Sequence, residues 1–125
     1  MIDHMTFRVT DIERAKAFYA AALAPLGYLA AYDAVHGGVR MVGFSCESKI
    51  DTWFVSAPDA TTHCHLAWRA TNRASVDAFY AAAMAAGATD NGAPGVRAHY
   101  HSDYYGAFVI DPEGNNVEAV CHAPD

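Results

Sequence analysis

The chain contains an internal repeat, which limits the folds that it can adopt. The segment HMTFRVTD, which begins at His4, aligns with HLAWRATN, which begins at His65. At the same spacing, AFYAAALA from Ala17 aligns with AFYAAAMA from Ala78. Alanine suits any helix, but composition does not explain the matched His, Arg, Thr and Phe-Tyr residues. The repeat therefore predicts two copies of one supersecondary unit.

Each copy is expected to begin as a strand and to continue as a helix. Apolar and polar residues alternate through residues 5–9, which is the period of two that a half-buried strand requires. Thr10 and Glu13 then have the spacing of a capping box at a helix start. Apolar residues follow at helical spacing in both copies, so each helix is expected to cover the strand face that carries Phe7 or Trp68. The opposite face of each first strand is left open.

Short strands, separated by turn residues, fill the rest of each copy. The order β-α-β-β-β therefore occurs twice, and the fold class is α+β, with two tandem βαβββ modules and mainly antiparallel sheets. The 125 residues form one domain. Its parts are module 1 at about residues 1–57, a linker at 58–62 and module 2 at about 63–125. The strands expected after the helices are 28–34, 39–46, 52–56, 96–101, 105–110 and 117–121.

Composition excludes several classes of partner. A hydrophobic fraction of 53% supports a substantial core, and the net charge of −6 with scattered basic residues argues against nucleic acid. No apolar run approaches the roughly 20 residues that cross a bilayer, so no membrane partner is expected. The widely spaced cysteines Cys46, Cys64 and Cys121 are expected to be reduced thiols of a cytoplasmic protein.

The two equivalent histidines, His4 and His65, and the segment DPEGNNVE that ends at Glu118 give the chain a resemblance to a known superfamily. The chain resembles the vicinal-oxygen-chelate superfamily, which includes glyoxalase I, bleomycin-resistance proteins and extradiol dioxygenases. This resemblance covers nearly the whole chain. It implies that the sheets curl into a cup with the helices outside, and that His4, His65 and Glu118 bind a divalent metal ion (Zn, Fe, Mn or Ni).

The chain departs from the superfamily pattern at one position. A fourth ligand is expected on the last strand of module 1, but Thr52-Trp53-Phe54 offers no Glu, Gln or His. The resemblance implies a metal-dependent enzyme that acts on a small substrate chelated through adjacent oxygens, either a lyase or isomerase or a dioxygenase. The remaining His, His, Glu set matches the facial triad of non-haem iron oxygenases. The alternative is a non-catalytic protein of the bleomycin-resistance type that binds a small molecule such as a drug.

A second polar cluster is the segment VRAHYHSDYYG at residues 96–106. If this segment is a strand, Arg97, His99 and His101 share one face. Arg97 is then suited to grip an anionic substrate, and the histidines to transfer protons near pH 7. The candidate catalytic residues are therefore His99, His101 and Tyr105, and the candidate substrate-binding residues are Arg97, Trp53 and Tyr104.

Assembly as a homodimer is expected, because eight strands have sheet edges and an open cup leaves apolar surface uncovered. Tyr100, Tyr104 and Tyr105 lie near a strand turn, where they would contribute either to the dimer interface or to a lid over the cup. The sequence leaves open whether one cup is formed by the two modules of one chain or by modules of two chains.

Overall fold

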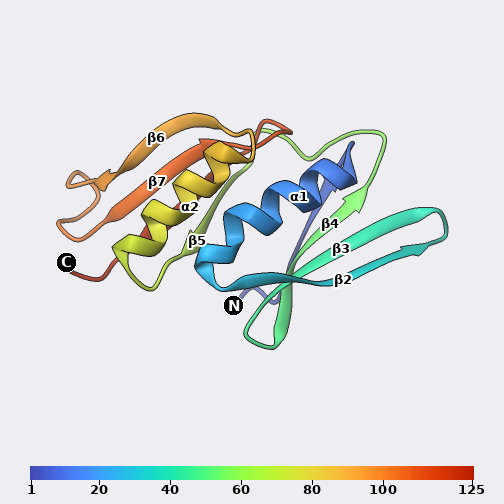
Figure 1. Ribbon diagram of the computed structural model, residues 1–125, viewed down its shortest axis with the longest axis horizontal. Coiled ribbons are helices and arrows are strands. Elements are labelled where there is room, and N and C mark those ends of the chain that lie inside the picture. Colours follow the sequence, from blue (N-terminus) through green and yellow to red (C-terminus); the bar gives the residue numbers. More distant parts are fainter.

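The computed structural model describes residues 1–125 and contains two modules of the same design (Figure 1). The order β-α-β-β-β occurs twice, and the α+β fold class is confirmed. In chain order the elements are β1 (Met5–Val9), α1 (Ile12–Leu23), the short 3-10 helix η1 (Ala24–Leu26), β2 (Tyr28–His36), β3 (Val39–Cys46), β4 (Lys49–Ser56), β5 (His65–Arg69), α2 (Arg73–Ala85), β6 (Thr89–Val96), β7 (Tyr105–Ile110) and β8 (Asn116–Cys121).

Each module forms its own four-stranded sheet. Sheet 1 has the order β1-β4-β3-β2, and sheet 2 has the equivalent order β5-β8-β7-β6. In each sheet the first strand pairs parallel with the last strand of the module, and the other pairs are antiparallel. The repeat seen in the sequence is therefore a repeat of topology and of strand register.

The helices cover one face of each sheet, as the apolar pattern predicts (Figure 1). Phe18 of α1 and Phe79 of α2 occupy equivalent core positions, with exposed fractions of 1% and 0%. Phe7 and Trp68, on the first strands, are buried on the same side of their sheets. The opposite face of each sheet carries no helix, and we call these surfaces the open faces.

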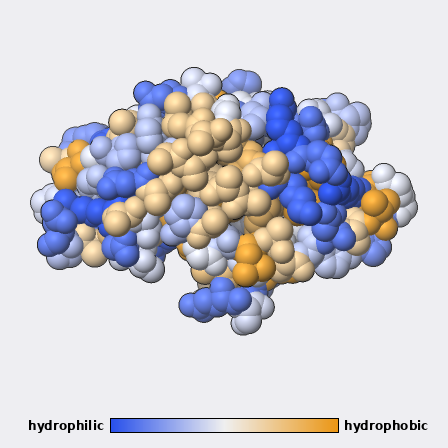
Figure 2. Space-filling view, viewed as in Figure 1, coloured by the Kyte–Doolittle hydropathy of each residue, from blue (hydrophilic) through white to orange (hydrophobic).

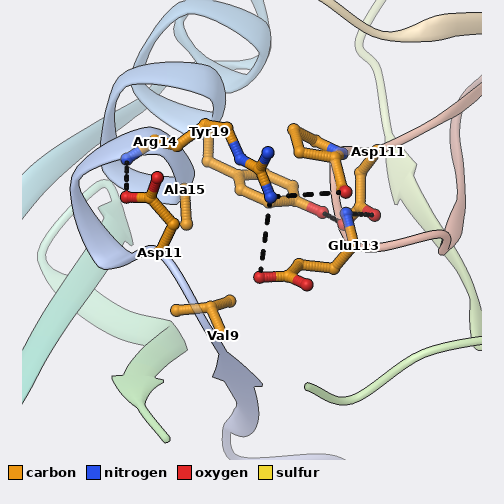
Figure 3. Close-up of a pocket in the computed structure, with 8 residues that line it drawn as sticks. Val9, Asp11, Arg14, Ala15, Tyr19, Asp111 and Glu113 are labelled. Atoms are coloured by element: carbon orange, nitrogen blue, oxygen red, sulfur yellow. Dashed lines mark hydrogen bonds and ion pairs between the residues drawn. The ribbon is translucent and has the colours of Figure 1, made fainter. Parts of the chain in front are cut away.

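The two modules meet along the helices, where α1 packs against α2. The Tyr19 hydroxyl of α1 donates a hydrogen bond to Asp111 in the β7–β8 turn, and this burial next to a carboxylate raises the pKa of Tyr19. Figure 3 shows these two side chains at a cavity between the modules. Its volume of about 10 Å³ is the space of one water molecule. This cavity is therefore a small packing gap between the two modules and is too small for a ligand.

The start of α1 differs from the expected capping box. The N-cap is Asp11, whose carboxylate accepts from the main-chain N–H of Arg14. Thr10 instead donates its N–H and hydroxyl to Glu113 in module 2. A carboxylate from the other module competes for Thr10, so Asp11 takes the capping position.

The second strand of module 2 lies earlier in the chain than expected, and the predicted strand at 96–101 is wrong. β6 covers Thr89–Val96, and residues 97–104 form turns. Gly92, Pro94 and Gly95 are typical of loops. However, β6 is an edge strand, where proline is tolerated, and register shifts at Gly92 and Gly95 accommodate the glycines.

The outer surface of the two helices is weakly apolar, because alanines of α1 and α2 face solvent there (Figure 2). Neither helix has the length and apolar character that a bilayer-spanning segment needs.

Candidate functional site

The candidate site lies on the open face of sheet 2. β-strands alternate their side chains between the two faces, so Val117 and Ala119 of β8 enter the core while Glu118 points to the open face. The register places Glu118 between Ala67 of β5 and Phe108 of β7. The central strand therefore presents a carboxylate in the middle of this face.

Glu118 is buried, with an exposed fraction of 1%, and three neighbours explain how it is accommodated. The Tyr104 hydroxyl donates a hydrogen bond to Oε1. Nε2 of His65 lies 3.1 Å from Oε2. Gly106 leaves room for the carboxylate, because a Cβ at that position would lie 3.1 Å from Oε1 and 3.2 Å from the Tyr104 ring.

Tyr104 is a neutral hydrogen-bond donor at physiological pH. Partial burial, then the hydrogen bond to Glu118 and the charge of that carboxylate, raise the pKa of Tyr104 above its ordinary value. A hydroxyl with a raised pKa keeps its proton at neutral pH, so Tyr104 continues to donate to Oε1. This interaction fixes the direction in which the second oxygen, Oε2, points.

The ring of His65 is held by two contacts. Nδ1 lies 3.1 Å from the main-chain oxygen of Asn116, and a carbonyl oxygen only accepts, so Nδ1 carries the donated proton. In the neutral ring Nε2 then has the lone pair, and this atom faces Oε2 of Glu118. Two acceptor atoms 3.1 Å apart repel each other unless a proton or a cation lies between them. The pair therefore fits either a shared proton or a metal ion between the two atoms.

His4 lies on sheet 1, at the residue that precedes β1, and not with this pair. Its Nδ1 is 2.7 Å from Asp3, whose carboxylate also accepts from Lys49. Both His4 and His65 are exposed, and neither lies on a helix-covered face. No group of three His, Cys, Asp or Glu side chains in the single chain is arranged to hold a metal ion.

The strand register explains the missing fourth ligand. In sheet 2, Glu118 is opposite Ala67, the second residue after His65. In sheet 1, the residue opposite Thr6, the second residue after His4, is Trp53. Trp53 therefore occupies in module 1 the position that Glu118 occupies in module 2. Its ring packs edge-on against Tyr32, so this open face has an aromatic wall in place of a carboxylate.

A pocket of about 300 Å³ adjoins the His65–Glu118 pair on the same face. The shared element is Phe108, whose ring lies 6.2 Å from the His65 ring and 5.4 Å from the Arg97 guanidinium. Of the predicted substrate-binding residues, the structure brings Arg97 to this pocket and Tyr104 to Glu118, whereas Trp53 lies on the other sheet. The pocket is lined by Asn91, Gly92, Arg97, His99, Tyr100, Phe108 and Asn116.

The predicted catalytic residues are not gathered in one place. His99 lines the pocket but comes from a turn, so it does not share a strand face with Arg97 as predicted. His101 points to the C-terminal segment, where its Nε2 lies 2.9 Å from Nδ1 of His122. Tyr105 lies on the helix-covered side and donates to Asp77 of α2 at 2.7 Å.

Sequence reasoning missed three residues of this site. Asn116 orients His65, Gly106 makes room for the buried carboxylate, and His122 is the partner of His101. For Asn116 a signal was available, because alternation along the last strand puts it on the same face as Glu118.

The fold and the site together define a protein with two βαβββ modules and a buried, hydrogen-bonded carboxylate beside a histidine on an open sheet face. A family model, the Glyoxalase/Bleomycin resistance protein/Dioxygenase superfamily, matches residues 1–119. The chain belongs to this superfamily, as its sequence resemblance indicates.

Solved structures with the same fold are numerous. The chain is 28% identical to a glyoxalase/bleomycin resistance protein from Albidiferax ferrireducens T118, with a TM-score of 0.71 and 97% of each chain covered. A glyoxalase/bleomycin resistance protein/dioxygenase family enzyme from Burkholderia phytofirmans PsJN is 20% identical, with a TM-score of 0.71 and 98% of each chain covered. Glyoxalase I from Zea mays is 18% identical with a TM-score of 0.71, and the match covers 99% of this chain and 45% of the maize chain. A comparison with curated protein sequences gives no match.

Proposed function

We propose that this protein is a metal-dependent enzyme that acts on a small substrate chelated through adjacent oxygens, of the lyase or isomerase type or of the dioxygenase type. The metal ligands in this proposal are His4, His65 and Glu118. The observation that carries it is the pair of acceptor atoms, Nε2 of His65 and Oε2 of Glu118, held 3.1 Å apart. Each side chain is oriented by a hydrogen bond at its other polar atom, Nδ1 of His65 or Oε1 of Glu118, which is typical of metal ligands.

The residues around the pair have distinct tasks in this proposal. A divalent ion would supply Lewis acidity toward the substrate oxygens. Tyr104 holds the Glu118 carboxylate, and Arg97 binds the substrate in the adjacent pocket. His99, which lines this pocket, and His101 are the candidates for proton transfer, because an imidazole ring can both accept and donate a proton. Tyr105 was a further candidate, but its hydrogen bond to Asp77 directs it away from this face.

A homodimer would complete the site. In one chain, His65 and Glu118 lie together on sheet 2, while His4 is bonded to Asp3 on sheet 1. If the open face of sheet 1 of a second copy faces sheet 2, it adds His4 and the wall formed by Trp53. An isologous dimer would form two such cups, each with one ligand from sheet 1 and two from sheet 2. We place this dimer in the cytoplasm, where the three free cysteines would remain reduced.

A second candidate is a non-catalytic protein that binds a small molecule or drug. The aromatic pair Trp53 and Tyr32 on the open face of sheet 1 favours it, because aromatic walls bind flat, apolar ligands without chemistry. Metal binding separates the two candidates.

The first prediction concerns metal affinity. Protein purified without a histidine tag is expected to bind Zn²⁺ or Co²⁺, and Glu118→Gln is expected to weaken binding by at least about 100-fold, because it removes the anionic ligand but keeps its shape. Isothermal titration measures the affinity, and the Co²⁺ spectrum reports the ligand set. His63→Asn is the matched control: His63 is exposed in the segment just before β5, and asparagine tolerates its φ of 59°. Equal affinities of wild type and Glu118→Gln would remove the metal site and favour the second candidate.

The second prediction concerns Tyr104. We expect Tyr104→Phe to lower Zn²⁺ affinity by roughly 10- to 100-fold, because the carboxylate loses the donor that orients it. Tyr100→Phe is the control, since no hydrogen bond of the Tyr100 hydroxyl is present and its side chain is exposed. An unchanged affinity in Tyr104→Phe would show that Glu118 does not need this donor.

A further inference from the structure

We propose that the pocket beside Glu118 binds a small hydroxycarboxylate, with its carboxylate on Arg97 and its hydroxyl on Asn116. This inference rests on the proposed function only in taking the open face of sheet 2 as the substrate site. It goes further by naming the substrate class. Four features of the pocket carry it: its position, the fixed geometry of Arg97, the lack of an internal counter-ion and an unpaired acceptor on Asn116.

The Arg97 guanidinium is held in place by the strand that precedes it. One Nη donates to the main-chain oxygen of Ala93 at 2.7 Å, and the group lies over the Phe108 ring at 5.4 Å. Cβ atoms built at Gly92 and Gly95 would lie 3.2 and 3.1 Å from its two Nη atoms. Side chains at these positions would therefore crowd the guanidinium. The two glycines of β6, unusual in a strand, provide the surface on which Arg97 rests.

This cation has no carboxylate partner within the chain, although the chain is acidic. Six of the eight Lys and Arg side chains form ion pairs with carboxylates. Arg97 forms none, and its one hydrogen bond to Ala93 leaves most of its five donors free. A planar fork of free N–H groups matches a carboxylate, which it binds bidentately. The net charge of −6 repels anions from most of the surface, so an unpaired, fixed cation in a pocket marks a local site where an anion can bind.

Asn116 supplies the second half of the recognition. Its side-chain oxygen is buried and has no hydrogen-bond partner, although the residue lines the pocket. An unpaired buried acceptor is costly, and a ligand hydroxyl that donates to it removes this cost. The main chain of the same residue accepts from His65, so this hydroxyl would lie next to the His65–Glu118 pair. The pocket volume of about 300 Å³ admits a small organic acid.

Binding of mandelate to the metal-free protein tests the inference. We expect mandelate to shift the backbone amide resonances of residues 91–93 and 95–99 in a ¹⁵N NMR titration. Mandelamide, which lacks the charge, should bind more weakly than mandelate by roughly 10-fold or more. Phenylacetate, which lacks the hydroxyl, should bind more weakly by roughly 3- to 10-fold. Arg97→Gln should weaken mandelate binding by roughly 10- to 100-fold. Lys16→Gln, which removes one positive charge from helix α1, should bind mandelate like wild type.

The controls separate the outcomes. Equal mandelate binding by wild type and Arg97→Gln, or no binding by wild type, overturns the inference, and so does inorganic phosphate that binds as tightly as mandelate. Because the protein is metal-free, these results do not depend on the metal ligands. If the wild-type protein binds mandelate but not Zn²⁺, only the proposed metal site is contradicted. If the wild-type protein binds Zn²⁺ but not mandelate, only this inference is contradicted.

Discussion

Replacement of Phe79 by alanine is expected to lower the free energy of unfolding by about 3–5 kcal/mol. Phe79 has an exposed fraction of 0% and lies in the core between α2 and sheet 2, where a cavity would remain after truncation. The expected loss is a large part of the stability of an ordinary domain, which is about 5–15 kcal/mol. Urea denaturation followed by circular dichroism measures it, with an unchanged slope as evidence that the transition stays two-state.

The repeat makes this prediction sharper, because Phe18→Ala in module 1 should have an effect of the same size. Leu29→Ala is the control, since Leu29 is 59% exposed on β2, and its effect should stay within about 1 kcal/mol. A loss below about 1 kcal/mol for either phenylalanine would mean that the helices are not packed on the sheets as the repeat requires.

Much of the fold could be predicted because the repeat carries information at two levels. Matched sequence segments fixed the number of modules, and the apolar pattern of each first strand identified the face that the helix covers. Phe7 and Trp68 accordingly lie in the core. Local rules failed where a partner distant in the sequence decides the structure. Glu113 of module 2 takes Thr10 away from the capping role, and only the edge position of β6 allows Pro94 within a strand.

The candidate site could be predicted residue by residue but not as an arrangement. The resemblance singled out Glu118 from its motif, and in the structure the alternation along β8 puts this residue on the open face. Alternation gives no guidance in the turn at residues 97–104, and there the prediction favoured Tyr105 over Tyr104 as a catalytic residue. The two neighbours point to opposite sides: Tyr104 bonds to Glu118 and Tyr105 to Asp77. A one-residue difference at a strand start therefore separates a site residue from a helix contact.

Mixing two variants that do not bind metal tests whether His4, the third ligand, comes from the same chain as the His65–Glu118 pair or from a second chain. We expect His4→Ala and Glu118→Gln to lose metal binding separately, and to regain it when the two are unfolded, mixed in equal amounts and refolded together. In a mixed dimer with a cup across the two chains, one cup joins the mutated His4 to the mutated Glu118. The other cup then receives an intact His4 from one chain and an intact His65–Glu118 pair from the other.

The size of the recovery is set by the symmetry. Random pairing makes half of the dimers mixed, and each mixed dimer has one intact cup, so metal content should reach about one quarter of the wild-type value. Bound Zn²⁺ per chain after gel filtration measures this fraction. The control is a mixture of His65→Ala with Glu118→Gln, because these two ligands belong to the same sheet and no cup is restored. If one chain supplied all three ligands, mixing His4→Ala with Glu118→Gln would restore nothing, and the dimer would have no part in binding the metal.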